Sequence, residues 1–116
     1  MMTNNPTILI ISNHFNHRVA YAAGLAGYGY PVLEAATLDD AHAHIEAGGE
    51  PSTLVIDLKP RSMGVAEITH LLNVRRPNRL IVIYGSDDDY AVAQQLSADV
   101  LLPRPANLDD LLANIA

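Results

Sequence analysis

The sequence predicts an α/β fold in which a parallel sheet is covered by helices on both faces. Five short apolar runs have the character of buried strands, and each is followed by a segment with the three-to-four-residue spacing of an amphipathic helix. Strands that alternate with helices form parallel sheets, and right-handed crossovers leave few topologies. With 116 residues the chain has the length of one domain, so we expect a single unit over residues 1–116.

The first predicted strand, residues 7–11, is an unbroken apolar run. It ends at a polar trio that suits a loop or a helix cap, namely Ser12, Asn13 and His14. A helix over 15–27 follows and is closed by glycines. We expect one side of this helix to face the sheet, and that side consists of Phe15, Val19, Ala22, Ala23 and Ala26.

Residues 31–35 form the second predicted strand, and a helix begins at Thr37. Two carboxylates in its first turn, Asp39 and Asp40, favour the positive end of the helix dipole, and the glycines at 48–49 end it. Its expected inward face consists of Leu38, Ala41 and Ile45.

The third predicted strand, residues 53–57, is an apolar run that ends in the carboxylate of Asp57. A loop containing Pro60 leads to a helix over 63–76, which keeps the helical period. The apolar positions of that helix are Val65, Ile68, Leu71 and Leu72.

The fourth predicted strand covers residues 80–84, and three aspartates then open a helix over 87–96. The fifth strand, 99–102, ends at the turn around Arg104, and Asn107 caps the last helix. That helix turns Leu108, Leu111, Leu112 and Ile115 inward.

Composition excludes several classes of protein. The chain has no cysteine, which rules out disulfides and thiolate chemistry and fits a cytoplasmic location. A formal charge of −6 argues against binding to nucleic acid. No apolar run approaches the roughly 20 residues that cross a bilayer, so no membrane partner is expected either.

Asp57 is the first candidate functional residue. A carboxylate rarely lies at the end of a buried strand without a use, and ligands of open α/β sheets bind at the carboxyl ends of the strands. We therefore expect the loops that follow neighbouring strands to surround Asp57.

The whole pattern resembles the receiver domain of two-component response regulators, the CheY-like, flavodoxin-like fold. The resemblance is carried by Asp57 in LVIDLKP, by Met63, by Arg104-Pro105, and by the last helix, NLDDLLANI. It implies three layers, α/β/α, with five helices and a five-stranded parallel sheet in the order 2-1-3-4-5. It also implies that Asp57 stands at the position that accepts a phosphoryl group from a histidine kinase.

The site departs from the family pattern where a metal would bind. Two acidic residues normally follow the first strand, and here they are Ser12 and Asn13. Because Mg²⁺ prefers anionic oxygens in a near-octahedral array, we expect a degraded magnesium site. Its remaining ligands would be Asp57, a carbonyl near Lys59 and, weakly, Asn13.

Further departures affect the catalytic and switching positions. Gly85 replaces the family's hydroxyl residue after the fourth strand, with Ser86 next to it, and Arg104 replaces the lysine before a cis-type proline. Arginine presents a planar fork rather than a point charge, so this exchange is not conservative. Leu101 stands where a switchable aromatic is common, and Pro60 comes one residue early. These changes indicate an atypical receiver, or pseudo-receiver.

Two interpretations of Asp57 remain open. It is either a phosphoacceptor or a carboxylate held by Arg104, because one cation can balance one anion once the neighbouring carboxylates are gone. The histidines do not predict zinc, since no third ligand lies at metal spacing. We expect His14 beside Asp57, and His42 and His44 on a solvated helix face.

We therefore expect a non-enzymatic, stand-alone receiver-like module that signals by protein–protein interaction. Its partner would be a histidine kinase or a downstream signalling protein, and a homodimer could form through the fourth helix, fifth strand and fifth helix. No cofactor is expected, apart from magnesium if the degraded site still binds it. Two alternatives remain: phosphorylation of Asp57 with Asn13 and Ser86 standing in for the missing groups, or a sensor of a small anion or metabolite. The pocket of such a sensor would comprise Ser12, Asn13, Asp57, Gly85 and Arg104.

Overall fold

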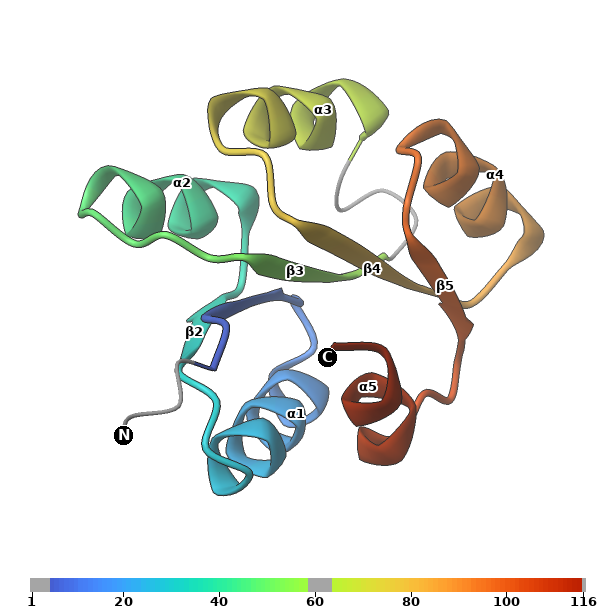
Figure 1. Ribbon diagram of the computed structural model, residues 1–116. Coiled ribbons are helices and arrows are strands. Elements are labelled where there is room, and N and C mark those ends of the chain that lie inside the picture. The colour runs from blue at the N-terminus through green and yellow to red at the C-terminus, as the bar shows by residue number, and fades with distance from the viewer. Residues whose placement is uncertain (1–4, 59–63, 116) are drawn as a thin grey trace.

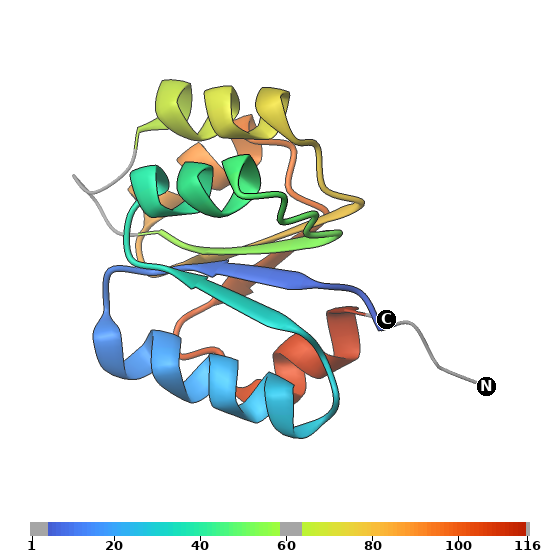
Figure 2. The same cartoon turned by 90° about the vertical axis from the view of Figure 1, so that its left-hand side faces the viewer.

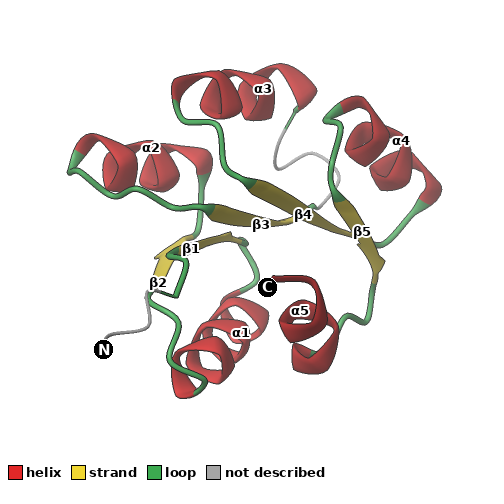
Figure 3. Cartoon of the chain, viewed as in Figure 1, coloured by secondary structure: helices red, strands yellow, loops and turns green. Residues whose placement is uncertain are grey.

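The computed structural model describes residues 5–58 and 64–115 and contains a parallel sheet between two layers of helices (Figures 1 and 3). Its strands are β1 (Ile8–Ile11), β2 (Val32–Ala35), β3 (Thr53–Asp57), β4 (Arg79–Tyr84) and β5 (Val100–Pro103). Its helices are α1 (Phe15–Gly27), α2 (Leu38–Glu46), α3 (Val65–Val74), α4 (Asp87–Gln95) and α5 (Leu108–Ile115). The strand order β2-β1-β3-β4-β5 confirms the predicted topology. Lys59, Pro60 and Met63 lie outside the described residues.

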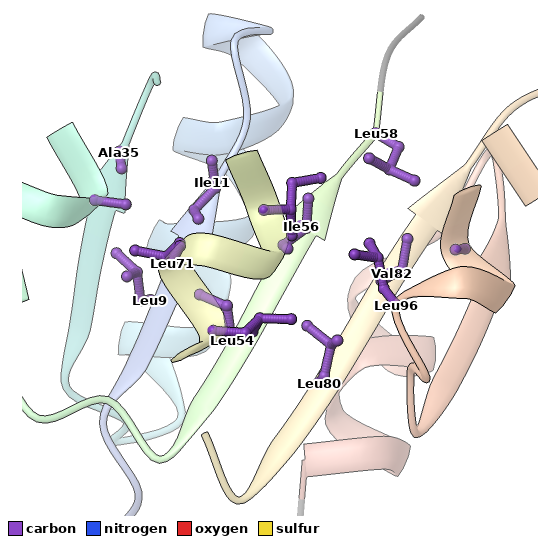
Figure 4. Packing of buried hydrophobic residues seen from close by; sticks show 14 residues of the cluster. Leu9, Ile11, Ala35, Leu54, Ile56, Leu58, Leu71, Leu80, Val82 and Leu96 are labelled. Carbon is purple, nitrogen blue, oxygen red and sulfur yellow. The ribbon is translucent and has the colours of Figure 1, made fainter. Parts of the chain in front are cut away.

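The helices divide between the two faces of the sheet. Helices α1 and α5 cover one face, and α2, α3 and α4 cover the other (Figures 1 and 2). Alternate residues of β3 enter the two cores: Leu54 and Ile56 pack with Leu71 of α3 (Figure 4), whereas Val55 packs with Leu25 of α1. The central strands are thus buried on both faces, which explains their unbroken apolar sequences.

Parallel pairing brings distant loops to one edge of the sheet. Ile11 lies opposite Ile56 and Asp57 opposite Ile83, so β1, β3 and β4 end at nearly the same level. Strand β5 adds Pro103 opposite Tyr84. The residues that follow these strands therefore converge on Asp57.

Three helices begin with the same reciprocal cap. The side chain of the capping residue accepts a hydrogen bond from the backbone N–H three residues later. The aspartate at that position accepts one in return, from the N–H of the cap or of the residue before it. The pairs are Thr37 with Asp40, Ser86 with Asp89, and Asn107 with Asp110. This explains why acidic residues gather in these first turns. None of the helices in the described ranges has the length and apolar character needed to cross a membrane.

The predicted inward face of α1 is confirmed at Ala22 and wrong at its other positions. Phe15 is 64% exposed and Val19 is 39% exposed, whereas Ala22 and Leu25 are buried. The predicted members Ala23 and Ala26 are exposed as well. Alanine marks an inward face only weakly because it fits either side of a helix. The ring of Phe15 lies instead against the guanidinium of Arg18, at 5.4 Å from its carbon to the ring centroid.

The corrected face of α1 predicts unequal effects of two truncations. We expect Leu25→Ala to lower the free energy of unfolding by about 2–4 kcal/mol, because it leaves a cavity beneath the sheet. Val19→Ala, on the exposed side of the same helix, should change it by about 0.5 kcal/mol or less. Urea titrations followed by circular dichroism would compare the two variants. Equal losses would contradict the assigned face.

Candidate functional site

The site is centred on Asp57, the last residue of β3, which is 1% exposed. An ionised carboxylate buried to this extent loses its hydration, and the loss is costly unless charge and hydrogen bonds replace it. Each oxygen of this carboxylate has a partner from another loop.

Ser12 serves one of the two oxygens. Its hydroxyl, fully buried, donates to Oδ2 of Asp57 at 2.8 Å and accepts from the backbone N–H of His14 at 3.2 Å. Arg18 holds the same loop: its Nη1 donates to the carbonyl of Ser12 at 2.9 Å, and its Nε lies 3.3 Å from a carboxylate oxygen of Glu34. The donor to Asp57 is therefore fixed in place.

Arg104 bonds the other oxygen, which is the contact expected under one of the two interpretations of Asp57. Its Nε donates to Oδ1 of Asp57 at 2.9 Å, and its Nη2 lies 2.8 Å from the same oxygen. Nη2 also donates to the backbone carbonyl of Leu58. The backbone N–H of Arg104 donates to the carbonyl of Tyr84 at 2.8 Å, and the peptide bond to Pro105 is cis, as the resemblance implied. The guanidinium thus spans the carboxylate and the start of the β3–α3 loop.

Gly85 lies against the guanidinium from the β4 side. A Cβ built on Gly85 would come 2.7 Å from Nη1 of Arg104. The N–H of Gly85 donates to Oδ2 of the buried Asp89 at 3.3 Å, which ties this loop to the start of α4.

Tyr21 of α1 ties down the loop that follows Arg104. Its hydroxyl donates to the carbonyl of Ala106 at 2.8 Å. Burial raises the pKa of Tyr21 above its ordinary value of 10.0; the carboxylate of Asp57 raises this pKa further, and Arg104 opposes the change. The folded protein therefore favours the neutral phenol.

Two of the predicted site residues lie elsewhere than the family pattern implies. Asn13 is exposed, and its side chain makes no hydrogen bond to any of the described residues. Ser86 is also exposed, and its hydroxyl caps α4 by accepting from the N–H of Asp89 at 3.2 Å. Leu101 packs against the core shared by α2, α3 and α4. Among the described residues, Ser12 and Arg104 bond Asp57 and Gly85 lies against Arg104, whereas Asn13 and Ser86 form no hydrogen bond to Asp57.

In the part of the chain that the structure describes, the oxygens around Asp57 do not leave the set of free donors that a magnesium ion needs. Both carboxylate oxygens already accept hydrogen bonds, and the carbonyl of Leu58 accepts from Arg104. Mg²⁺ requires several free oxygen donors in octahedral array. Within 5–58 and 64–115, moreover, no group of three or more His, Asp or Glu side chains is arranged to hold a metal ion.

The histidines serve packing and capping. Nδ1 of His14 accepts from the N–H of His17 at 3.2 Å, and the two rings stack at 3.7 Å. Within the described segments, His14 is linked to Asp57 through the hydrogen bond that its backbone N–H donates to Ser12. His42 and His44 were expected in solvent, but both are half-buried because they face neighbouring elements. His42 lies beside His70 of α3, with ring centroids 5.4 Å apart, and Nε2 of His44 is 2.7 Å from the carbonyl oxygen of Glu34.

A cleft of about 370 Å³ opens between α2 and α3. It is lined by Leu38, Asp39, His42, Ala66, Glu67 and His70. None of these side chains contributes to the Asp57 site.

Sequence reasoning missed three residues that support the site: Arg18, Tyr21 and Asp89. Asp89 had a usable signal, because the spacing Ser-x-x-Asp is that of a reciprocal cap. Arg18 and Tyr21 donate hydrogen bonds to backbone carbonyls, and no sequence pattern predicts such bonds.

The Asp57–Arg104 pair predicts an asymmetric loss of stability. We expect Arg104→Gln to lower the free energy of unfolding by about 2–4 kcal/mol, because it leaves a buried carboxylate without its cation. Adding Asp57→Asn removes that uncompensated charge, so the double variant should be more stable than Arg104→Gln alone. Urea unfolding at neutral pH measures both. A double variant at least as unstable as the single one would contradict this account.

The raised pKa of Tyr21 predicts a loss of stability in alkali. Tyr21 ionises in the unfolded chain at its ordinary pKa, which is lower than its pKa in the folded protein. The contribution of the neutral phenol to the free energy of unfolding is therefore complete below pH 10.0 and is lost as the pH rises through the folded pKa. Tyr21→Phe should flatten that part of the curve of unfolding free energy against pH. Tyr28→Phe, at a largely exposed position, is the control and should leave the curve unchanged. Equal curves for Tyr21→Phe and wild type would refute the assignment.

Comparison with known proteins finds similarity at the level of the fold. No protein-family model and no curated protein matches the chain by sequence. Among solved structures, a CheY-like receiver domain from Methanospirillum hungatei JF-1 has a TM-score of 0.81 at 26% identity, over 97% of this chain and 91% of that one. A response regulator from Burkholderia pseudomallei, solved with a phosphorylated aspartic acid, calcium and citrate, has a TM-score of 0.80 at 25% identity, over 97% and 67%. The chemotaxis protein CheY4 of Vibrio cholerae has a TM-score of 0.79 at 17% identity, over 95% of each chain. The chain thus has the fold of the CheY-like receiver domains of two-component response regulators.

Proposed function

We propose that this chain is an atypical receiver that signals by binding a protein partner, with its phosphoacceptor position held by an internal cation. The observation that supports this most directly is the occupancy of the Asp57 carboxylate. Ser12 donates a hydrogen bond to one oxygen and Arg104 to the other, and Asp57 itself is 1% exposed.

Phosphoryl transfer to Asp57 would require the opposite arrangement. A carboxylate oxygen must approach the phosphorus in line, and a divalent cation must neutralise the charge that develops on the phosphoryl oxygens. Here the approach to Oδ1 is occupied by a guanidinium, and the donor set does not fit magnesium. Group transfer would first have to break an ion pair whose carboxylate is almost fully buried.

The alternative of a small-anion sensor gains no support from the geometry. An arginine that binds an anion offers free donors to it. Arg104 instead directs Nε and Nη2 at groups of its own chain, Asp57 and the carbonyl of Leu58. An incoming anion would also meet the negative charge of Asp57.

Partner binding would use the surface formed by α4, β5 and α5, as the resemblance implies. Tyr90 of α4 is 38% exposed and packs against Tyr84 at the end of β4, with ring centroids 5.0 Å apart. Partly exposed aromatic pairs of this kind are common anchors of protein interfaces. A histidine kinase or downstream signalling protein in the cytoplasm is the proposed partner, and a second copy of the chain could dock on the same face. The module itself would catalyse no reaction.

A phosphodonor experiment tests the proposal. The protein is incubated with magnesium and acetyl phosphate, and its intact mass is measured. We expect no mass increase in the wild type, because Asp57 is paired and the metal ligands are replaced. A gain of one phosphoryl group that disappears in Asp57→Asn would overturn the proposal and establish the phosphoacceptor function.

A variant with the family's residues restored provides the positive control. It carries Ser12→Asp, Asn13→Asp, Gly85→Thr and Arg104→Lys, and circular dichroism checks that it folds. This variant should gain one phosphoryl group under the same conditions and lose that gain when Asp57→Asn is added. Labelling of wild type and restored variant to the same extent would show that the pairing does not block transfer.

A further inference from the structure

We propose that Gly85 is a positioning residue: its missing side chain admits the Arg104 guanidinium to the cation position of the Asp57 site. Residues 85 and 104 would then form one functional unit. The inference rests on the proposed function, in which an internal cation takes the place of a metal, and it names the residue that makes this possible.

Steric space explains why residue 85 is a glycine. A Cβ on Gly85 would lie 2.7 Å from Nη1, 3.4 Å from Cζ and 3.8 Å from Cδ of Arg104. Non-bonded heavy atoms are most stable at about 3.5–4.0 Å, so the first of these contacts is a clash. Even the smallest side chain at residue 85 would displace the guanidinium.

The backbone conformation of residue 85 does not explain why it is a glycine. In the described part of the chain, the glycines that adopt a positive φ are Gly29, at 91°, and Gly48, at 98°. Gly85 is not one of them, so an L-residue could adopt its backbone conformation. What excludes a side chain there is the neighbouring arginine.

Neither partner can move aside freely. An arginine head normally swings away from a clash, but this one is held by Asp57 and by the carbonyl of Leu58. Gly85 is held by its hydrogen bond to Asp89, whose own N–H is bonded to Ser86. A side chain at residue 85 must therefore weaken the Asp57–Arg104 pair.

The same geometry defines a ligand class. Oδ1 of Asp57 and the carbonyl oxygen of Leu58 both face the guanidinium and accept from it. When Arg104 is truncated, these two acceptors form a site for a free guanidinium ion. The matching probe is methylguanidinium, at millimolar concentrations where it does not denature.

A double-mutant cycle tests the coupling between residues 85 and 104. In the wild type, Gly85→Ala should lower the folding equilibrium constant by about tenfold, a coupling typical of residues in contact. In the Arg104→Ala background the same change should cost little, because nothing remains to clash with. Gly27→Ala is the control, since a Cβ there meets no atom within 4 Å. Equal costs of Gly85→Ala in both backgrounds would overturn the inference.

Two further measurements do not depend on stability alone. In ¹⁵N NMR spectra, the Nε–H of Arg104 should exchange slowly in the wild type and rapidly in Gly85→Ala, which keeps every charge of the site. Methylguanidinium should raise the melting temperature of Arg104→Ala by several degrees, but not that of Asp57→Asn/Arg104→Ala. Unchanged exchange in Gly85→Ala, or equal rescue of both variants, would refute the assignment.

These outcomes are separable from those of the phosphodonor experiment. A wild type that gains a phosphoryl group would refute the proposed function but would not affect the result of the double-mutant cycle. An additive cycle would refute the role of Gly85, whatever the mass measurement gives.

Discussion

The structure depends on the compensation of one buried carboxylate. Asp57 lies at the end of a central strand with 1% of its surface exposed, where an unpaired charge costs several kcal/mol. The hydroxyl of Ser12 and the guanidinium of Arg104 supply the compensation from two different loops. The same guanidinium also bonds the start of the β3–α3 loop at Leu58. One charge therefore organises three loops at the carboxyl edge of the sheet.

Most of the fold could be predicted because local signals and burial agree along the chain. The strands are unbroken apolar runs since both faces of the central sheet are covered, and three helix starts are marked by a Ser, Thr or Asn followed three residues later by Asp. The inward face of α1 could not be predicted in the same way. Its alanines fit either side of the helix, and the ring of Phe15 packs on Arg18 rather than in the core.

The site was predictable to the extent that sheet topology determines it. Parallel register alone brings Ser12, Asp57 and Arg104 to one edge, and charge balance then favours the observed pair, although the two charged residues are 47 positions apart. What topology cannot predict is which way a loop side chain turns. Asn13 is exposed, and the hydroxyl of Ser86 caps α4 within its own loop.

An internal cation changes the kind of signal that such a site can carry. A dissociable metal and a phosphoryl group respond to concentration, so an aspartate that binds them would give its loops more than one charge state. A guanidinium attached to the chain has a fixed stoichiometry and stays charged at any physiological pH. In the proposed function, Arg104 stays bonded to Asp57 and Leu58 and would give the loops a single charge state. Under the proposed function, information would enter through the abundance of the protein or the binding of its partner, because the charge at Asp57 would not vary.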